Sequence, residues 1–377
     1  MTERSYFMRF FQFIFITTMV VVSINYFVDP FGITGAPRVP GLNEYKVDIS
    51  SRVRLMKKYS PLMSQHNVLV VGNARSEIGI NPAHHCFAAN GMIVYNMGLP
   101  GANVRDQVSY AANVMNHQPV KAVFFSLDFT DFIFTRRKTG RYVQKTLWEH
   151  QERGFKYRAD GEDNPAYLSG LVVDYYSALF SLDSLISSFK TLALQGKFAS
   201  DRTAAGFNPA RDYNGVLQVE GSSALFDQKM KDLREHFAVP WYLVDSEGGM
   251  DTSFDEVRRF LDLARQKQAR VYLFINPLHE IFWTLLRDRG LTSLNEAWLE
   301  EIQKLVKDYP TDTVTLWDFS GDSPYIHEPV PAPGIKTGTL RWFWEPSHYR
   351  EELGGLMIET MLSERCGTDE AFGKKLY

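Results

Sequence analysis

The stretch Val68-Leu-Val-Val-Gly-Asn-Ala-Arg-Ser-Glu-Ile-Gly-Ile-Asn-Pro82 decides how the fold of this chain is interpreted. Its four leading apolar residues predict a buried strand, and the Gly72-Asn73 pair predicts a tight turn directly after it. A tight turn after a strand is a position at which α/β enzymes expose a nucleophile. The residue at that position is Ala74, which has no hydroxyl group with which to attack a substrate.

Apolar runs alternate with helical patterns through much of the remaining chain. Further strands are predicted at 92–95, 122–127, 270–275 and 314–317, and helices at 102–115, 254–265, 280–289, 295–307 and 350–362. Strands without a polar face, alternating with helices, are typical of a parallel sheet that is covered on both sides. The predicted fold class is therefore α/β, a three-layer parallel sheet flanked by helices.

The strand pattern is interrupted once, over residues 131–250. This segment is too long for a structureless loop in a compact domain, and residues 166–194 have the spacing of a helix. We therefore expect a mostly helical insertion that caps or flanks the site. The α/β domain is then formed by residues 66–130 and 251–366, and residues 367–377 form a tail.

The N-terminal segment has the properties of a membrane helix. Residues 10–27 are apolar without a charge, about as long as the roughly 17–25 residues needed to span a bilayer. Arg4 and Arg9 precede them, so residues 1–28 are expected to be a cytoplasmic tip and a single transmembrane anchor. A cleaved signal peptide or a buried core helix is less favoured. Residues 29–65 are expected to form a linker and an amphipathic segment.

Composition restricts the partners and cofactors. The chain has 377 residues with 14% aromatic and 23% charged residues, as in a globular protein, and a net charge of -3 that predicts no binding to nucleic acid. No spacing of ligand residues indicates a metal site, and we expect no cofactor. His84 and His85 are expected to be a solvated pair. Cys86 and Cys366 are too few for a disulfide scaffold, and isolated thiols are favoured over a pair.

Polar residues follow the predicted strands, where ligands of parallel sheets bind. They are Arg75 after the first strand, Asn96 and Gly101 after the second, Asp128 after the third, and Asn276 and His279 after the fourth. Glu345 and His348 stand just before the last helix, in Trp344-Glu-Pro-Ser-His-Tyr349. We expect Arg75, Asn96, Gly101, Asp128, Glu345 and His348 to form one site with position 74, whereas the role of His279 stays ambiguous.

The order of these motifs resembles the SGNH/GDSL hydrolase superfamily. The resemblance implies that Ala74 stands at the nucleophile's place, that His348 is the base, and that Glu345 replaces the family's aspartate. It also implies that the N–H of Gly101 serves an oxyanion hole, and that Asp128 occupies the place of the family's asparagine.

A nearer resemblance is to membrane-anchored periplasmic proteins of exopolysaccharide O-acetylation, of the alginate-acetylation type. The block Gly-x-x-Arg-x-x-x-Gly-Ile-x-Pro and the Trp-Glu-Pro-Ser-His-Tyr ending carry it. It implies a polysaccharide substrate and a place in the inner membrane, with the soluble part in the periplasm. It also implies a membrane-bound acyltransferase or polysaccharide synthase as partner.

The chemistry of such a site needs a hydroxyl, a base and an orienting carboxylate. An ionised Asp128 cannot donate to an oxyanion, and Arg75 is its expected partner. Ser76 and Ser347 are poor replacements for the missing nucleophile because of their positions in the turns. Three functions stay open: an acetylesterase or O-acetyltransferase whose nucleophile is replaced, a non-catalytic glycan-binding or scaffold subunit, and an unrelated anchored α/β domain.

Overall fold

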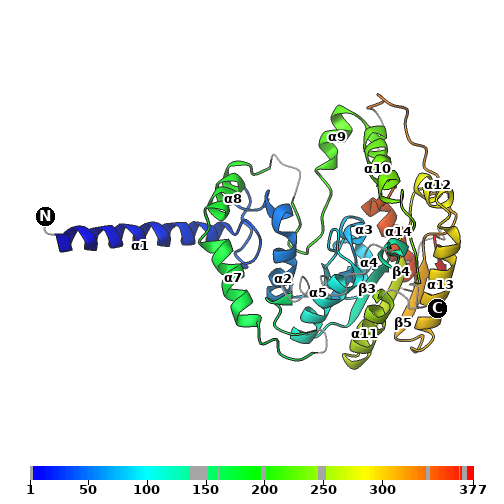
Figure 1. The fold of residues 1–377 in the computed structure, drawn as a ribbon, viewed down its shortest axis with the longest axis horizontal. Helices are drawn as coiled ribbons and strands as arrows, with labels where there is room; N and C mark the ends of the chain where they lie inside the picture. Colours follow the sequence, from blue (N-terminus) through cyan, green and yellow to red (C-terminus); the bar gives the residue numbers. More distant parts are fainter. Residues whose placement is uncertain are drawn as a thin grey trace.

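The computed structural model describes residues 3–135, 152–158, 161–196, 201–244, 252–336, 340–364, 366 and 372–377. In these residues the chain forms a six-stranded sheet with helices on both faces, and one long helix that projects away from it (Figure 1). The predicted α/β class with a mostly parallel, helix-flanked sheet is confirmed at this level of description.

The sheet has the strand order β2-β1-β3-β4-β5-β8. Its strands are β1 (Val68–Val71), β2 (Val94–Asn96), β3 (Ala122–Leu127), β4 (Arg270–Ile275), β5 (Val314–Asp318) and β8 (Lys374–Lys375). The first five are parallel, and β8 pairs antiparallel with β5. Five strands thus lie close to their predicted places, whereas β8 is too short to leave a periodic signal in the segment expected to be a tail.

Alternate residues of the strands bury themselves in two separate cores. Leu69 and Val71 face α2 (Val53–Met63), α5 (Val104–His117), α11 (Ser253–Gln266) and α13 (Thr292–Val306). Val68 and Val70 face α4 (His85–Ala89) and α14 (Glu351–Met361) on the other side. Because both faces are covered, the strands read as continuous apolar runs, and burial of this apolar surface supplies most of the driving force for folding.

Between β3 and α11, the described residues form four α-helices. They are α7 (Tyr167–Leu179), α8 (Leu182–Ala193), α9 (Tyr213–Val219) and α10 (Ser222–His236). The prediction of one helix over 166–194 is wrong, because the chain turns between α7 and α8. Ser181 caps α8, and its hydroxyl accepts a hydrogen bond from the N–H of Ser184 at 3.1 Å. The apolar spacing is helical on both sides of this turn and therefore hides it.

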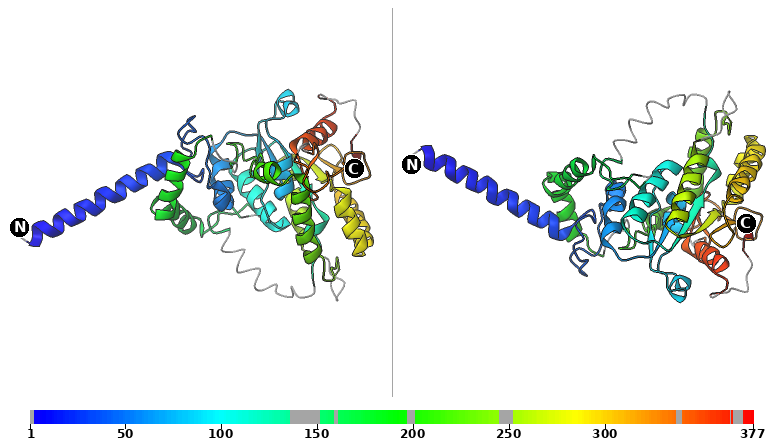
Figure 2. Two further views of the ribbon diagram at one scale, coloured as in Figure 1. Left: turned by 90° about the horizontal axis from the view of Figure 1, so that it is seen from above. Right: turned by 90° about the horizontal axis from the view of Figure 1, so that it is seen from below.

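Helix α1 (Glu3–Val28) extends away from the remainder of the molecule as a rod (Figures 1 and 2). It is long and apolar enough to cross a membrane, and its apolar window is 0% buried. Only its end packs on the protein: Asn25 donates to the carbonyl of Leu179 and accepts from the hydroxyl of Ser188, both at 2.8 Å. The length and composition of α1 fit a membrane anchor or a signal sequence.

Cys86 and Cys366 form a disulfide, so the expectation of two isolated thiols is wrong. Their Cα atoms lie 5.5 Å apart, although 280 residues separate them in the sequence. The bond joins α4 to the chain just after α14. Two cysteines at such a separation leave no local pattern, which is why the sequence alone does not reveal the pairing. Disulfides persist mainly in oxidising compartments outside the cytoplasm.

Loss of this disulfide is expected to destabilise the fold. Replacing Cys86 and Cys366 together by serine removes the cross-link from the unfolded chain and should lower the free energy of unfolding by about 2–4 kcal/mol. Denaturant unfolding with and without a reductant measures the effect. The unchanged chain in reductant is the matched control, because it retains both side chains. Two freely titrating thiols in the unreduced native protein would contradict the pairing.

Candidate active site

The candidate site lies at the point where the order of the strands in the sheet changes direction. From β1 the chain adds β2 on one side and then β3 on the other, so the carboxyl ends of β1 and β3 form the switch point at which open parallel sheets bind their ligands. Asn73, after β1, donates a hydrogen bond to the Asp128 carboxylate after β3 at 2.6 Å. Asn276, after β4, donates to the same oxygen at 3.0 Å. Polar side chains from three strands therefore meet at this edge.

Arg75 joins this cluster to a hairpin near the C-terminus. Its guanidinium forms a buried ion pair with Asp128 at 2.9 Å, and its Nε donates to the carbonyl of Ser347 at 2.8 Å. Ser347 lies in the turn between β6 (Phe343–Glu345) and β7 (His348–Tyr349). Arg75 follows Ala74 directly, and Ser347 precedes His348 directly. The nucleophile position and the expected base are thus brought to the same rim of the sheet.

Glu345 and His348 form a hydrogen-bonded pair in that hairpin. The Nδ1 atom of His348 contacts the carboxylate of Glu345, which also accepts from the N–H of Ser347 at 2.9 Å. Burial would raise the pKa of Glu345, but the charge and hydrogen bond of His348 outweigh it and lower that pKa to about 2. In the described part of the chain, Nε2 of His348 has no partner. An imidazole held at Nδ1 with Nε2 free has the arrangement of a general base.

Ala74 begins the short helix α3 (Ala74–Gly79), and it is the one residue from Val71 to Ile80 that is not buried. The Asn73 side chain caps this helix and accepts from the N–H of Arg75 at 3.0 Å. The N–H of Ala74 has no hydrogen-bond partner among the residues that the structure describes. Residue 74 therefore presents a free N–H at a helix N-terminus, where negative charge is stabilised, but it presents no nucleophile.

Two further residues from the predicted site have different roles. Gly101 lies in an exposed turn with φ +65°, and its N–H is free of partners within the described ranges. Asn96 is fully buried and structural: its amide donates to the carbonyls of Ser76 and Ile80 at 2.8 Å, and its oxygen accepts from the N–H of Gly98. Gly101 thus remains available to a ligand, whereas both ends of the Asn96 amide are occupied.

The remaining polar candidates are held in place by structural contacts. The hydroxyl of Ser76 is buried and donates to the Asn73 carbonyl, and that of Ser347 donates to Glu345 at 2.9 Å. His279 is 1% exposed; it caps α12 (Glu280–Asp288), and its Nε2 lies 2.9 Å from the carbonyl of Glu328. Neither serine is placed to replace the missing nucleophile, and His279 is a satisfied core histidine.

A group of potential metal ligands lies away from the site, around α4. Side-chain atoms of His84, His85, Cys86 and Glu359 lie within 4.8 Å of one another. The sulfur of Cys86 belongs to the disulfide and offers no thiolate. Burial, with a smaller effect from the neighbouring His85, lowers the pKa of His84 to about 4. We assign no metal to this group.

The segment between β3 and β4 packs beside the β6–β7 hairpin. Helix α10 packs against β6, and Trp344 is 8% exposed in a cluster with Ile78 of α3 and Leu225 of α10. The ring of Tyr213 lies 5.4 Å from that of Trp344. Burial, and then the charge of Glu345, raises the pKa of Tyr213. The segment therefore flanks the Glu345–His348 pair. Trp344 is part of a buried apolar cluster and does not form an exposed platform.

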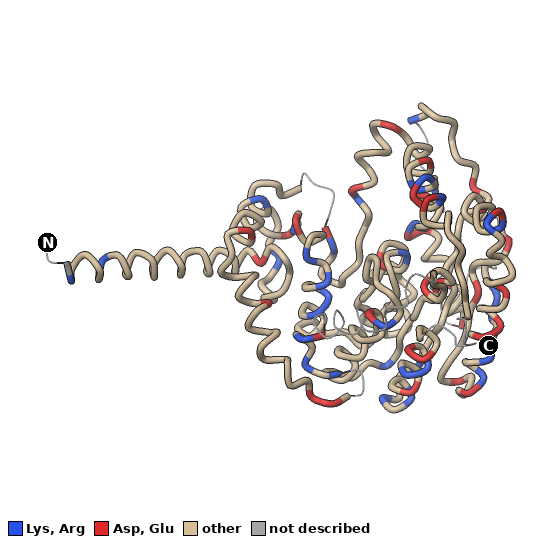
Figure 3. Tube along the Cα trace, viewed as in Figure 1, with Lys and Arg blue, Asp and Glu red and all other residues tan. Residues whose placement is uncertain are grey.

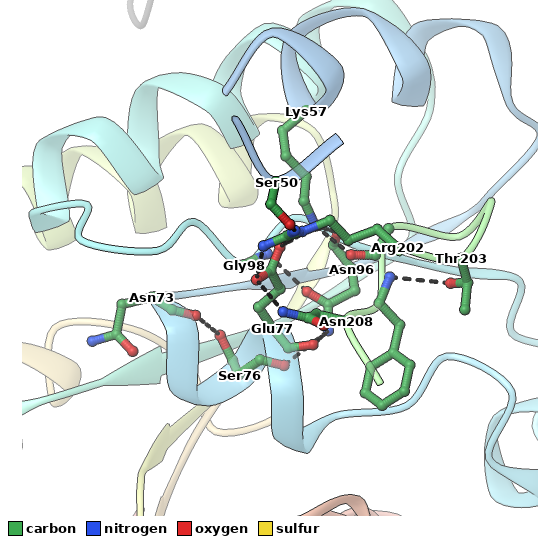
Figure 4. Close-up of polar contacts among 12 residues, drawn as sticks. Ser50, Lys57, Asn73, Ser76, Glu77, Asn96, Gly98, Arg202, Thr203 and Asn208 are labelled. Atoms are coloured by element: carbon green, nitrogen blue, oxygen red, sulfur yellow. Dashed lines mark hydrogen bonds and ion pairs between the residues drawn. The ribbon is translucent and has the colours of Figure 1, made fainter. Parts of the chain in front are cut away.

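Sequence reasoning missed a buried ionic cluster under α3. Glu77 is 0% exposed, and Arg202 grips its carboxylate with contacts of 2.9 and 3.1 Å (Figure 4). Lys57, also 0% exposed, lies 3.6 Å from Glu77 and donates to the carbonyl of Asn96. Burial lowers the pKa of Lys57 to about 8, although Glu77 opposes the shift. The available signal was a charged residue, Glu77, between a buried strand and the apolar residues Ile78 and Ile80.

This ionic cluster fixes the helix that carries position 74. Glu77 lies one turn beyond Ala74, and its two cationic partners come from α2 and from the segment before α9. Removal of the Glu77 carboxylate would leave the buried Lys57 and Arg202 without a compensating charge, which is strongly unfavourable. The cluster therefore positions α3, and we assign it no part in the chemistry of the site.

Comparison with known proteins gives no relative from which to transfer a function. No family model matches the chain, and no curated protein matches it either.

The pH dependence of the free energy of unfolding should reveal the interaction between the carboxylates of Asp128 and Asp131. Burial, and then the charge of Asp128, raises the pKa of Asp131 above its ordinary value. Such a group binds a proton on folding, so its contribution to the free energy of unfolding is highest below the unfolded pKa of about 3.9 and falls as pH rises through the raised value. Asp131→Asn should remove this fall.

The asparagine can retain the local hydrogen bonds, because one oxygen of Asp131 accepts from Asn73 at 3.1 Å and from Gln107 at 3.2 Å. Melting temperatures between pH 4 and 9 give the comparison, with the exposed Asp312→Asn as the matched control. We expect Asp131→Asn to gain on the unchanged chain as pH rises. Parallel curves for all three proteins would show that Asp131 ionises normally.

Proposed function

We propose that the chain is a membrane-anchored, extracytoplasmic protein with an SGNH-like acyl-transfer site, of the kind that esterifies or de-esterifies exopolysaccharides, in which alanine replaces the nucleophile. One observation carries the proposal: the hydrogen-bonded Glu345–His348 pair, with a free Nε2, is tied through Arg75 to the N-terminus of α3 at Ala74. The proposal explains why an imidazole is oriented as a base beside a residue that has no hydroxyl proton to give it.

Each part of the rim has a role once a hydroxyl stands at position 74. Nε2 of His348 takes the hydroxyl proton while the oxygen attacks an acyl carbonyl, and Glu345 stabilises the resulting imidazolium. The N–H groups of residue 74 and Gly101 are the candidates for stabilising the oxyanion. Asp128 takes no part, because Arg75 and two asparagines occupy its carboxylate. With Ala74 the chain retains the acyl-binding rim but forms no acyl-enzyme.

Three features support the proposed location: the packing of Asn25, the two arginines before the apolar stretch, and the disulfide. Asn25, near the end of α1, is 1% exposed and packed on α7 and α8, which supports a helix that stays attached. Arg4 and Arg9 precede the apolar stretch, so the rest of the chain lies outside the cytoplasm. The Cys86–Cys366 disulfide fits an oxidising compartment. We assign α1 to the inner membrane and the α/β domain to the periplasm, beside a membrane-bound acyltransferase or synthase.

A second candidate is a non-catalytic glycan-binding or scaffold subunit of the same machinery. It is favoured by Ala74 itself and by the ion pair that neutralises Asp128. In this alternative the rim binds an oligosaccharide or a partner without any acyl transfer.

Restoring the hydroxyl tests the acyl-transfer site. Ala74→Ser should raise acetate release from an activated ester at least about 100-fold above the unchanged chain, because general-base catalysis contributes on that scale. Adding His348→Ala should return the rate to background. The exposed Ala83→Ser is the matched control and should stay inactive. A folded Ala74→Ser variant without activity would overturn the proposal.

Binding distinguishes the second candidate. If the rim is only a binding surface, calorimetry with acetylated oligosaccharides should give the same affinity for the unchanged chain and for His348→Ala. If the imidazole faces the acyl group, as the acyl-transfer proposal requires, the variant should bind at least about tenfold more weakly, a difference of about 1.4 kcal/mol.

A further inference from the structure

Helices α7 and α8 expose an apolar face with no covering element in the described part of the chain. Its members are aliphatic and aromatic side chains with 43–71% of their surface exposed: Leu168, Val172, Val173, Tyr176, Phe180, Leu182, Ile186 and Phe189. Leu168, Val172, Tyr176 and Phe180, which directly follows α7, recur at four-residue steps. Leu182, Ile186 and Phe189 recur at steps of four and three residues, so each set lies on one side of its helix. We call the full set the α7–α8 apolar face. Monomeric soluble proteins seldom expose so many large apolar side chains together.

This face lies at the root of α1. Both helices pack against α1, and Asn25 links the end of α1 to the carbonyl of Leu179 and the hydroxyl of Ser188. Figures 1 and 2 show α7 and α8 between the projecting rod of α1 and the sheet. Tyr26 and Phe27, at the same level of α1, are 45% and 69% exposed. The apolar surface of α1 therefore continues onto the two helices.

The charges of α7 and α8 are placed away from this face or at its margin. Asp174 is paired with Lys58 of α2 at 2.9 Å, and Lys190 is paired with Asp48, on the segment before α2, at 3.0 Å. Asp183 lies in the first turn of α8, where the helix dipole stabilises a carboxylate. Figure 3 shows the long uncharged stretch of α1 beside these helices. An apolar face with charges held on the other side is typical of a helix that lies in a membrane interface.

We propose that the α7–α8 apolar face is a second membrane contact, which lies in the headgroup–acyl boundary of the bilayer that α1 crosses. The continuity with α1 selects lipid as the occupant, because a surface beside the end of a transmembrane helix meets the bilayer first. The contact fixes the orientation of the α/β domain, which α1 alone would leave free to tilt. The proposal requires α1 to be embedded, but it is independent of acyl-transfer chemistry.

Site-directed fluorescence on the full chain in lipid nanodiscs tests this contact. Val172→Cys and Ile186→Cys, each labelled with an environment-sensitive nitrobenzoxadiazole, probe the face, and the native cysteines are held in their disulfide. Val20→Cys in α1 is the embedded reference. Glu300→Cys is the exposed control, on α13 at the end of the molecule opposite α1. Quenchers are nitroxide-labelled lipids and aqueous iodide.

We expect lipid nitroxide to quench the labels at 172 and 186 by half or more, and iodide to quench them at least threefold less than the label at 300. Labels at 172 and 186 that respond to iodide like the label at 300, while the label at 20 is quenched by lipid, would overturn the proposal and leave the anchor intact. Labels shielded from both quenchers would also overturn it, because a second copy or another protein would then cover the face. Both positions are exposed, so labelling leaves the core unchanged.

Discussion

The guanidinium of Arg75 holds together three segments that are far apart in the sequence. It pairs with Asp128 beyond β3 and donates to the carbonyl of Ser347 in the β6–β7 turn, while its own backbone lies in the first turn of α3. Arg75, Asp128 and Ser347 are all buried, so removal of Asp128 would leave the guanidinium as a buried charge without compensation. This constraint brings the helix N-terminus at position 74 and the imidazole of His348 to one rim. The rest of the site depends on it.

Around this ion pair lie the groups that the proposed acyl-transfer site requires, apart from an attacking oxygen. The imidazole of His348 is oriented through Nδ1, and the carboxylate of Glu345 stays ionised. Among the described residues, the N–H groups of Ala74 and Gly101 have no hydrogen-bond partner. The ionic cluster of Glu77 fixes α3, and α10 packs against β6 next to the Glu345–His348 pair. Buried charges thus fix the position of Ala74, a residue that cannot react. That combination favours a disabled or substituted acyl-transfer site over an unrelated α/β domain.

The parts of this structure that local sequence patterns encode were predictable. Continuous apolar runs placed five strands, and polar residues after strands placed Asp128 and Arg75 at one edge, since the carboxyl ends of parallel strands meet there. The parts that depend on pairing between distant residues were not. The Cys86–Cys366 bond, the grip of Arg202 on Glu77 and the antiparallel β8 leave no periodic signal, and the cap at Ser181 is hidden by helical spacing on both sides.

The most direct measurement of the central claim is covalent labelling of Ala74→Ser by a fluorophosphonate, followed by peptide mapping. The reagent reacts with a serine only when a base within hydrogen-bond reach activates it. The account predicts one modified residue, at position 74, and loss of the label when His348 is replaced by alanine. A folded variant that stays unlabelled, or is labelled equally without the imidazole, would contradict the convergence of these segments into an acyl-transfer site.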